Sequence, residues 1–356
     1  MIEPTSGNLL LAPADALVNT VNTEGVMGKG IALQFRNSYP AMYQNYLDAC
    51  KSGRIMLGEM HVYDLGAIGD GPRWIINFPT KGHWRSKSRI ADIEEGLKSL
   101  VQTIQRLQIR SIAVPPLGCG NGGLDWAEVK PRILKAFEAL PQVKVLLYAP
   151  GDAPAAADMP NATAKPKMTL AQATLIALMN QYRRGLLDPF VSLLEVQKLM
   201  YFMQEAGLNL KLSYKAHHYG PYATNLRQVL IRMEQHYLQG FGDGEDQPKK
   251  PLLLINDAIE ESDDFLAKRP DVQEQMERVA KLIDGYEDAY GMELLSTMHW
   301  VMCHDPEARY SCDAAIAAVH RWSGRKSELL KAPHLRKAWE RLKEQRWDDE
   351  SRSAIH

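Results

Sequence analysis

Cysteine is scarce in this chain, and its scarcity excludes one class of protein. The four cysteines are scattered over 356 residues, and no two of them form a C-x-x-C pair. A disulfide framework needs more cysteines at closer spacing. We therefore expect free thiols, which suit a reducing cytoplasm, at Cys50, Cys119, Cys303 and Cys312.

The chain also lacks an excess of charge and a long apolar run. Its 42 basic and 43 acidic residues leave a net charge of -1, so any contact with nucleic acid must be local. No run approaches the roughly 18 apolar residues of a membrane span. The start, Met1 to Pro4, has neither the basic nor the apolar part of a secretory signal. We expect a cytoplasmic protein without a membrane partner.

Residues 1–150 alternate short β-rich apolar runs with helical patterns, which is typical of an α/β sheet with helices on its faces. The spacing of apolar residues predicts a helix over 90–107, and capping-box spacing of Asp125 and Glu128 begins another that runs to Leu140. The expected strands are 16–21, 60–64, 74–78, 111–115 and 144–149.

Residues 151–168 are rich in alanine and proline, which predicts a linker between domains at 1–150 and 169–356. Beyond the linker, strand signals nearly vanish, apart from a possible short strand over 252–255. A second capping box, Ser192 with Glu195, opens one of the helices. Helices are expected from Thr169, Ser192, Ala223, Asp271, Met292, Cys312 and Pro333.

Two glycine-rich loops in the first domain each follow a strand and precede a helix. They span 25–30 and 118–123, and backbone N–H groups in such loops can converge on an anion. One loop alone is weak support, because glycine clusters are most often turns. Loops that follow the carboxyl ends of strands lie along one edge of an α/β sheet, so both could grip a diphosphate. Neither loop fits a Walker A or dinucleotide fingerprint.

Four motifs in order carry a resemblance over residues 1–150: Gly7-Asn8-Leu9, Ala16 to Asn22, Gly28 to Ala32, and Pro115 to Gly120. Together they resemble the macrodomain family, which implies a three-layer α/β/α fold with a mixed central sheet. In that family the Asn-x-x-Asn strand end and the first loop surround the distal ribose of ADP-ribose, and the second loop wraps its phosphates. Asn8 departs from the aspartate that many members use to contact adenine. The implied ADP-ribose-binding residues are Asn8, Leu9, Asn19, Gly28, Lys29, Gly30, Ile31, Thr80, Pro116, Leu117, Gly118, Cys119, Gly120, Asn121, Gly122 and Gly123.

Val18 to Thr23, Gly25 to Phe35 and Asn77 to Lys81 resemble the DarG-type antitoxins of DarT/DarG toxin–antitoxin systems more closely. This resemblance implies an enzyme that hydrolyses ADP-ribose from thymidine in single-stranded DNA, and that binds and neutralises a DarT-like ADP-ribosyltransferase toxin. It implies Lys81 and Asn22 as the catalytic pair. The region offers no clear carboxylate pair for acid–base work, which favours Lys81. We expect no metal and no cofactor, with ADP-ribose as the product.

Several of these residues have plainer interpretations. Lys81 could be a solvated loop lysine, and Asn22 could only brace the turn before Gly25. Cys119 is better read as a packing residue than as a nucleophile. His83, Trp84 and Arg85 join an aromatic face to positive charge, which suits a single strand, but they could equally form an ordinary exposed loop.

The second domain gives weaker signals. His217 to Tyr222, with the helix before it, resembles the Panacea-type helical domains of antitoxins, which implies toxin binding. The acidic run 257–264 could imitate DNA phosphates or be a solvated face. His299 and Cys303 stand one helical turn apart, but without further ligands they favour a packed helix over a metal site. Met200 to Met203 favour core packing.

Three rival functions remain open. The first is a module that reads ADP-ribose without cleaving it. The second is a macrodomain that acts on ADP-ribosylated protein or on O-acetyl-ADP-ribose. The third is an antitoxin whose main activity is to sequester its toxin.

Overall fold

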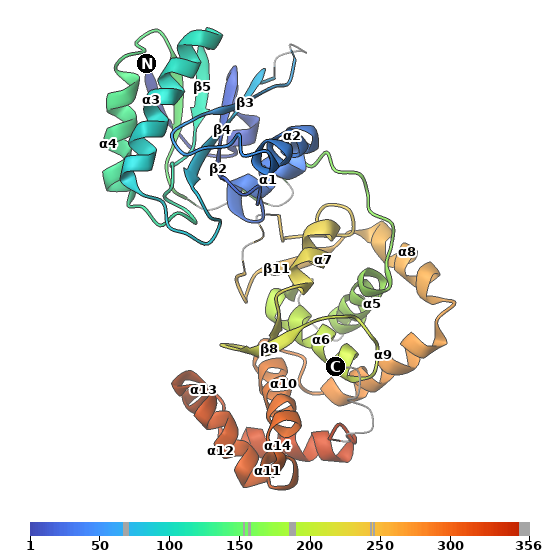
Figure 1. Cartoon of the computed structure of the whole chain (residues 1–356). Coiled ribbons are helices and arrows are strands. Elements are labelled where there is room, and N and C mark those ends of the chain that lie inside the picture. The colour runs from blue at the N-terminus through green and yellow to red at the C-terminus, as the bar shows by residue number, and fades with distance from the viewer. Residues whose placement is uncertain are drawn as a thin grey trace. The chain divides into compact units, whose positions relative to one another are not determined.

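The computed structural model describes residues 1–66, 71–151, 154, 155, 158–184, 190–242, 244 and 246–348. The chain forms two compact units, one of Met1–Ala164 with Gly242–Glu245 and one of Lys165–Phe241 with Asp246–His356 (Figure 1). Residues 152, 153, 156 and 157 of the expected linker, and 349–356 of the expected second domain, lie outside the described residues.

A six-stranded mixed sheet forms the centre of the first unit. Its strand order is β1-β6-β5-β2-β4-β3, with β3 antiparallel to β4 and the other neighbouring strands parallel. The strands are β1 (Ile2–Thr5), β2 (Ala16–Asn22), β3 (His61–Asp64), β4 (Trp74–Lys81), β5 (Ser111–Val114) and β6 (Lys144–Tyr148).

Each face of this sheet has its own apolar core, because successive side chains of a strand point to opposite faces. Ile76 and Phe78 of β4 pack with helices α3 and α4, whereas Ile75 packs with α1 and α2. The two pairs of helices therefore cover opposite faces (Figure 1). The helices are η1 (Leu9–Leu11, a 3-10 turn), α1 (Gly30–Ser38), α2 (Pro40–Lys51), α3 (Ile90–Leu107) and α4 (Trp126–Phe137).

The expected three-layer α/β/α fold with a mixed sheet is confirmed, and α3 has the predicted bounds. The five expected strands all form, and β4 extends three residues past the predicted end, to Lys81. Strand β1 was not predicted. It is short, contains Pro4, and forms by pairing with β6, which is distant from it in sequence.

The second unit is mainly helical, as expected. Its strands are short: β7 (Val191–Ser192), β8 (Tyr214–His217), β9 (Gly220–Ala223), β10 (Leu238–Gln239) and β11 (Pro251–Leu254). Its helices are α5 (Leu170–Arg184), α6 (Leu193–Glu205), α7 (Leu226–Met233), α8 (Asn256–Leu266), α9 (Pro270–Ile283), α10 (Ala289–His304), α11 (Pro306–Tyr310), α12 (Cys312–Trp322), α13 (Gly324–Leu329) and α14 (Ala332–Glu344).

The local predictions for this unit had mixed outcomes. The capping box of Ser192 and Glu195 is present in full at the start of α6, and β11 confirms the short strand near 252. The acidic run 257–264 lies within helix α8, which was not predicted. The stretch around His217 to Tyr222 forms a hairpin of β8 and β9, also not predicted. Among the described helices, none has the length and apolarity needed to cross a bilayer.

Candidate active site

The first glycine loop is shaped by the side chain of Asn22 at the end of β2. Its Oδ1 accepts hydrogen bonds from the backbone N–H of Glu24 at 3.0 Å and of Val26 at 3.3 Å, and its Nδ2 donates to the Val26 carbonyl at 2.6 Å. The buried hydroxyl of Tyr46 donates to the Asn22 carbonyl. Helix α1 begins at Gly30, at the end of this loop. Backbone N–H groups at a helix N-terminus favour an anion. Asn22 therefore positions the loop, and a direct catalytic role stays a prediction.

Asn19 lies three residues earlier, inside strand β2, and is not part of this loop. Its side chain is fully buried and donates to Asn77 Oδ1 at 2.9 Å. The Asn77 amide in turn lies 3.0 Å from His61 Nδ1. This buried polar chain fixes β2 against β4 and β3, and it gives Asn19 a supporting place. The predicted contact of Asn19 with ADP-ribose stays a prediction.

The second glycine loop closes on itself through backbone hydrogen bonds. The Leu124 N–H donates to the Gly118 carbonyl and the Gly123 N–H to the Gly120 carbonyl, each at 3.0 Å. A Cβ at Gly122 would lie 2.4 Å from the Gly118 carbonyl oxygen and 2.3 Å from Ser88 Oγ, so only glycine fits there. Helix α4 follows at once, capped by Asp125, whose carboxylate accepts from the Ala127 N–H at 2.9 Å. The N-terminus of a second helix thus follows the second loop.

Lys81 joins the two loops. It pairs with Asn22 in the register of β4 and β2, and its Nζ donates to the Asn121 carbonyl at 3.0 Å in the second loop. A Cβ at Gly30 would lie 3.4 Å from Asn121 Nδ2, so the end of the first loop also reaches Asn121. Partial burial lowers the pKa of the Lys81 amine. The structure therefore brings the predicted lysine and both predicted loops together around one residue, Asn121.

The loop after Lys81, residues 82–88, is fastened at both ends. The Thr23 N–H and hydroxyl both donate to the Gly82 carbonyl, at 3.1 and 3.0 Å, and the Ser88 N–H donates to the Gly122 carbonyl at 2.9 Å. His83 Nε2 lies 3.6 Å from a carboxylate oxygen of Glu24, which directly precedes the first loop. Sequence reasoning did not single out Glu24 or Asn121 as partners, because these contacts join segments that are distant in sequence.

Cys119 is placed as a packing residue. Burial, with a smaller contribution from the charge of Asp125, raises the pKa of its thiol to about 11. A thiol with that pKa is protonated at neutral pH and is a poor nucleophile. Its Sγ lies 3.6 Å from the Leu117 carbonyl oxygen, a further contact inside the loop.

Asn8 is held by the chain itself. Its Oδ1 caps η1 by accepting from the Leu10 N–H at 3.0 Å, and its Nδ2 donates to the Asp158 carbonyl at 2.8 Å. Ser38 Oγ likewise donates to the Pro160 carbonyl at 2.7 Å. Part of the segment expected to be a linker is thus bonded to the first unit. The adenine contact of Asn8 stays a prediction.

The remaining predicted binding residues differ in exposure, which bears on what they can touch. Five of them are buried and can support the loops from inside the unit: Leu9, Thr80, Leu117, Gly118 and Gly122. Gly120, Asn121 and Gly123 are exposed. Half-buried positions are taken by Gly28, Lys29, Gly30, Ile31 and Pro116.

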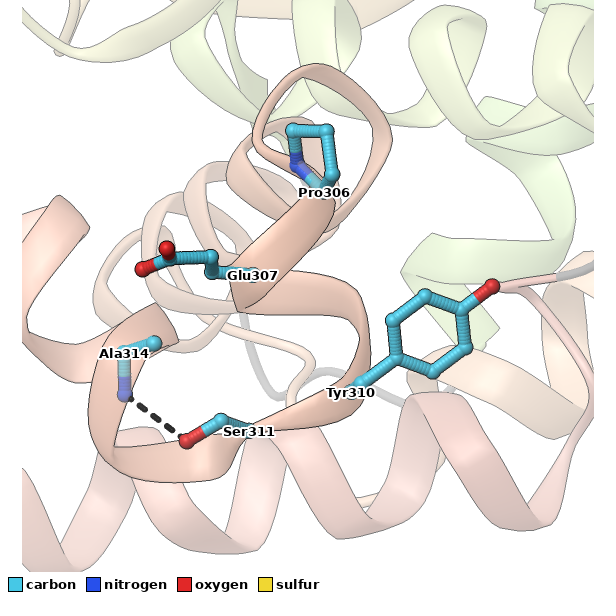
Figure 2. A pocket seen from close by; sticks show the side chains of 5 residues that line it. All are labelled: Pro306, Glu307, Tyr310, Ser311 and Ala314. Atoms are coloured by element: carbon cyan, nitrogen blue, oxygen red, sulfur yellow. Dashed lines mark hydrogen bonds between the residues drawn. The ribbon is translucent and has the colours of Figure 1, made fainter.

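A shallow depression of about 470 Å³ lies on the second unit, between α11 and α12. Figure 2 shows its lining residues Pro306, Glu307, Tyr310, Ser311 and Ala314, with the Tyr310 ring directed away from Glu307. It contains none of the predicted site residues and only one ionisable carboxylate, so its chemistry does not compete with that around Lys81.

Glu205, His299 and Cys303 lie together inside the second unit, each with one possible ligand atom within 4.8 Å of the others. Both nitrogens of the buried His299 ring already have partners: Nδ1 lies 2.7 Å from the Tyr201 hydroxyl and Nε2 lies 3.1 Å from the Trp347 carbonyl. These contacts explain the imidazole as part of a packed core, the interpretation that the sequence favoured.

Comparison with known proteins agrees with this geometry. The Macro domain family model matches residues 18–133, which include most of β2, both glycine loops and Lys81. A DNA ADP-ribosyl glycohydrolase from Thermus aquaticus is 46% identical over 342 residues, which cover 96% of this chain and 93% of that protein. The chain belongs to the family of DNA ADP-ribosyl glycohydrolases.

Two further relatives match a smaller part of the chain. A DNA ADP-ribosyl transferase-DNA ADP-ribosyl glycohydrolase fusion protein from Thermosipho africanus is 35% identical over 158 residues, 40% of each chain. The solved macrodomain of Thermus aquaticus DarG is 58% identical and aligns with 42% of this chain and 99% of its own, at a TM-score of 0.41. The resemblance expected from the sequence is confirmed by the family membership.

Proposed function

We propose that the first unit removes ADP-ribose from thymidine in single-stranded DNA by hydrolysis of the bond between the ribose and the base. The observation that carries this proposal is the position of Lys81, whose Nζ lies against the second glycine loop where the first loop also arrives. The N-terminus of α1, which has no side-chain cap, and the N–H groups of the two loops suit the diphosphate. The family relative from Thermus aquaticus, by its name, acts on the same class of substrate.

The chemistry needs a group that acts at the bond that breaks. Water adds to the anomeric carbon of the ribose, the bond to the base breaks, and the base leaves with a proton. As an ammonium, Lys81 can donate that proton to the base, and as a neutral amine it can attack the anomeric carbon before water does. Its lowered pKa increases the share of neutral amine at neutral pH. Water is the only co-reactant, so we propose no cofactor and no metal.

The first test is release of ADP-ribose from thymidine-modified single-stranded DNA by the full chain. Lys81→Ala should lower kcat by about a hundredfold or more, the usual contribution of one acid, base or nucleophile. Lys81→Arg keeps a positive charge but cannot attack carbon, so activity retained in this variant assigns the role to the charge. Lys98→Ala removes an exposed lysine on α3 and is the matched control.

The same assay separates the rival functions. A module that only reads ADP-ribose would bind it, as measured by calorimetry, with no release by the wild type. Faster release from an ADP-ribosylated peptide or from O-acetyl-ADP-ribose than from DNA would overturn the DNA assignment.

We further propose that the second unit binds a DarT-like ADP-ribosyltransferase toxin. The fusion of a transferase with a glycohydrolase in the Thermosipho protein supports a functional pairing of the two activities. Mixing the full chain with an inactive transferase should give a single species in size-exclusion chromatography. If the two proteins elute separately, and active transferase keeps its activity in the presence of Lys81→Ala, then the chain acts only by hydrolysis.

A further inference from the structure

Loop 82–88 presents an ordered aromatic surface immediately after Lys81. The His83 and Trp84 rings stack with their centroids 5.7 Å apart and their planes 20° from parallel. The Arg85 guanidinium carbon lies 4.4 Å from the centroid of the Trp84 ring, a cation–π contact. Large aromatic side chains are usually buried, yet Trp84 is 43% exposed. The His83–Trp84–Arg85 stack is therefore formed in advance on the surface.

Hydrogen bonds hold the loop on both sides of this stack and within it. Hydrogen bonds join Gly82 to Thr23, just before the first glycine loop, and Ser88 to Gly122 in the second. Inside the loop, the Arg85 N–H donates to His83 Nδ1 and the Ser86 N–H donates to the His83 carbonyl, both at 3.0 Å. A surface that is already ordered loses little conformational entropy when it binds a partner.

The loop that carries the stack contributes basic side chains and no acidic one. From Lys81 to Ala91 the sequence contains four basic residues and no acid. Arg85, Lys87 and Arg89 are exposed. Arg89 is paired with Asp92, and His83 Nε2 lies 3.6 Å from the carboxylate of Glu24, which directly precedes the first loop. The exposed surface thus combines aromatic rings with cations, in a chain whose net charge is only -1.

We propose that the His83–Trp84–Arg85 stack is a binding platform for single-stranded DNA beside the modified nucleotide, where an unpaired base stacks on the exposed part of the Trp84 ring and Arg85 contacts the backbone phosphate. This inference rests on the proposed function and adds the part of the substrate that lies outside ADP-ribose. Stacking requires a base face that is not already stacked within a duplex, which single strands offer. Because the platform follows Lys81 directly, it positions the strand so that the bond to be cleaved lies at the amine.

The first experiment compares two substrates with the full chain: an ADP-ribosylated oligonucleotide of about 12 nucleotides, within the range of known single-strand sites, and ADP-ribosylated thymidine mononucleotide. The wild type should have the lower KM for the oligonucleotide. Trp84→Ala should raise that KM by about tenfold, as expected when one base–aromatic stack is lost. Its KM for the mononucleotide should change less, so the ratio of the two KM values rises. Trp84→Phe keeps a ring and should restore most of the preference.

The matched control is Tyr310→Ala, which removes an exposed aromatic side chain from the second unit. It should leave both KM values unchanged. Equal KM values of the wild type for the two substrates, or an equal rise for both in Trp84→Ala, would overturn the platform while leaving the hydrolase in place.

The second experiment measures binding of an unmodified oligonucleotide by fluorescence anisotropy and does not depend on turnover. Arg85→Gln should reduce the slope of log affinity against log salt by about 0.7, the value for one phosphate contact to a single strand. Duplex DNA of the same sequence should compete poorly. The platform is wrong if duplex competes as well as the single strand, or if Trp84→Ala and Arg85→Gln both bind as the wild type does. If binding follows the expectation but the wild type releases no ADP-ribose, the proposed hydrolase fails and the platform stands.

Discussion

The two units of this chain differ in where they place their charged side chains. In the first unit, the chemistry-bearing groups lie at the ends of strands and in loops, with Lys81 half-buried and Asn121 exposed. In the second, Lys198, Lys326 and Glu293 are each at most 2% exposed. Polar groups at a loop edge remain available to a ligand, whereas buried charges must be satisfied within the protein. The comparison indicates that polar groups of the first unit remain accessible for chemistry, whereas the buried charged groups of the second unit stabilise its fold.

Arg325 and Lys326 surround the buried carboxylate of Glu293 in the second unit. Its carboxylate accepts two hydrogen bonds from Arg325, at 2.6 and 3.0 Å, and one from Lys326 Nζ at 2.8 Å. Burial alone would raise the pKa of Glu293, but Arg325 and Lys326 outweigh it and hold the pKa below its usual value. Lys198 Nζ donates to the Pro221 carbonyl in β9, at 2.7 Å, so these buried groups also support the β8–β9 hairpin.

The strongest test of the comparison is Lys326→Met. Methionine fills the space but leaves Glu293 and Thr297 without the ammonium that contacts both. Removing one partner of a buried pair costs about 3–5 kcal/mol, and we expect about 3 kcal/mol because Arg325 still balances Glu293. The free energy of unfolding by urea measures the loss. Binding of the transferase should weaken with it, while release of ADP-ribose continues.

An exposed lysine provides the matched control. Lys337 lies on the surface of α14, and Lys337→Met should change the free energy of unfolding by about 0.5 kcal/mol or less. Equal effects of the two lysine substitutions would show that the buried network contributes no more than surface charge, and the contrast between the units would be lost.

The fold of the first unit was largely predictable because its signals are local. Helix α3 shows the apolar spacing of an amphipathic helix over its whole length, and its predicted bounds match the structure. Strand β1 gave no such signal, since its pairing of Ile2 with Val145 joins the two ends of the unit. The hairpin strand β9 was missed because Pro221 is an unfavourable residue for a strand.

The candidate site was predictable in its parts but not in its connections. The two glycine loops and Lys81 stood out in the sequence, and they meet at Asn121. The complete burial of Asn19, and the pairing of Glu24 with His83, depend on how β2 and β4 lie side by side. The burial of Lys198 in the second unit was also unpredictable, because lysine is almost always exposed.

A smaller effect should come from the half-buried Glu205 of the second unit. Burial raises the pKa of its carboxyl to about 7, whereas an unfolded glutamate titrates near its ordinary value of 4.5. The folded state therefore holds the proton more tightly, and this contribution to stability is present below pH 4.5 and is lost as the pH rises towards and through 7. Glu205→Gln removes the ionisable group and so should stabilise the protein more at pH 8 than at pH 5, by about 1–2 kcal/mol.

The measurement is the difference in unfolding free energy between Glu205→Gln and the wild type at each pH. Burial also lowers the pKa of neighbouring His299, to about 4, so the wild type loses stability as the pH falls from 6.5. His299 is present in both proteins, so its contribution cancels in the difference. Glu260→Gln, on the exposed surface of α8, should give the same difference at both pH values. If Glu205→Gln behaves as this control does, the Glu205 carboxyl is solvated. Water then reaches this part of the second unit, in contrast to the buried side chains of Lys198 and Glu293.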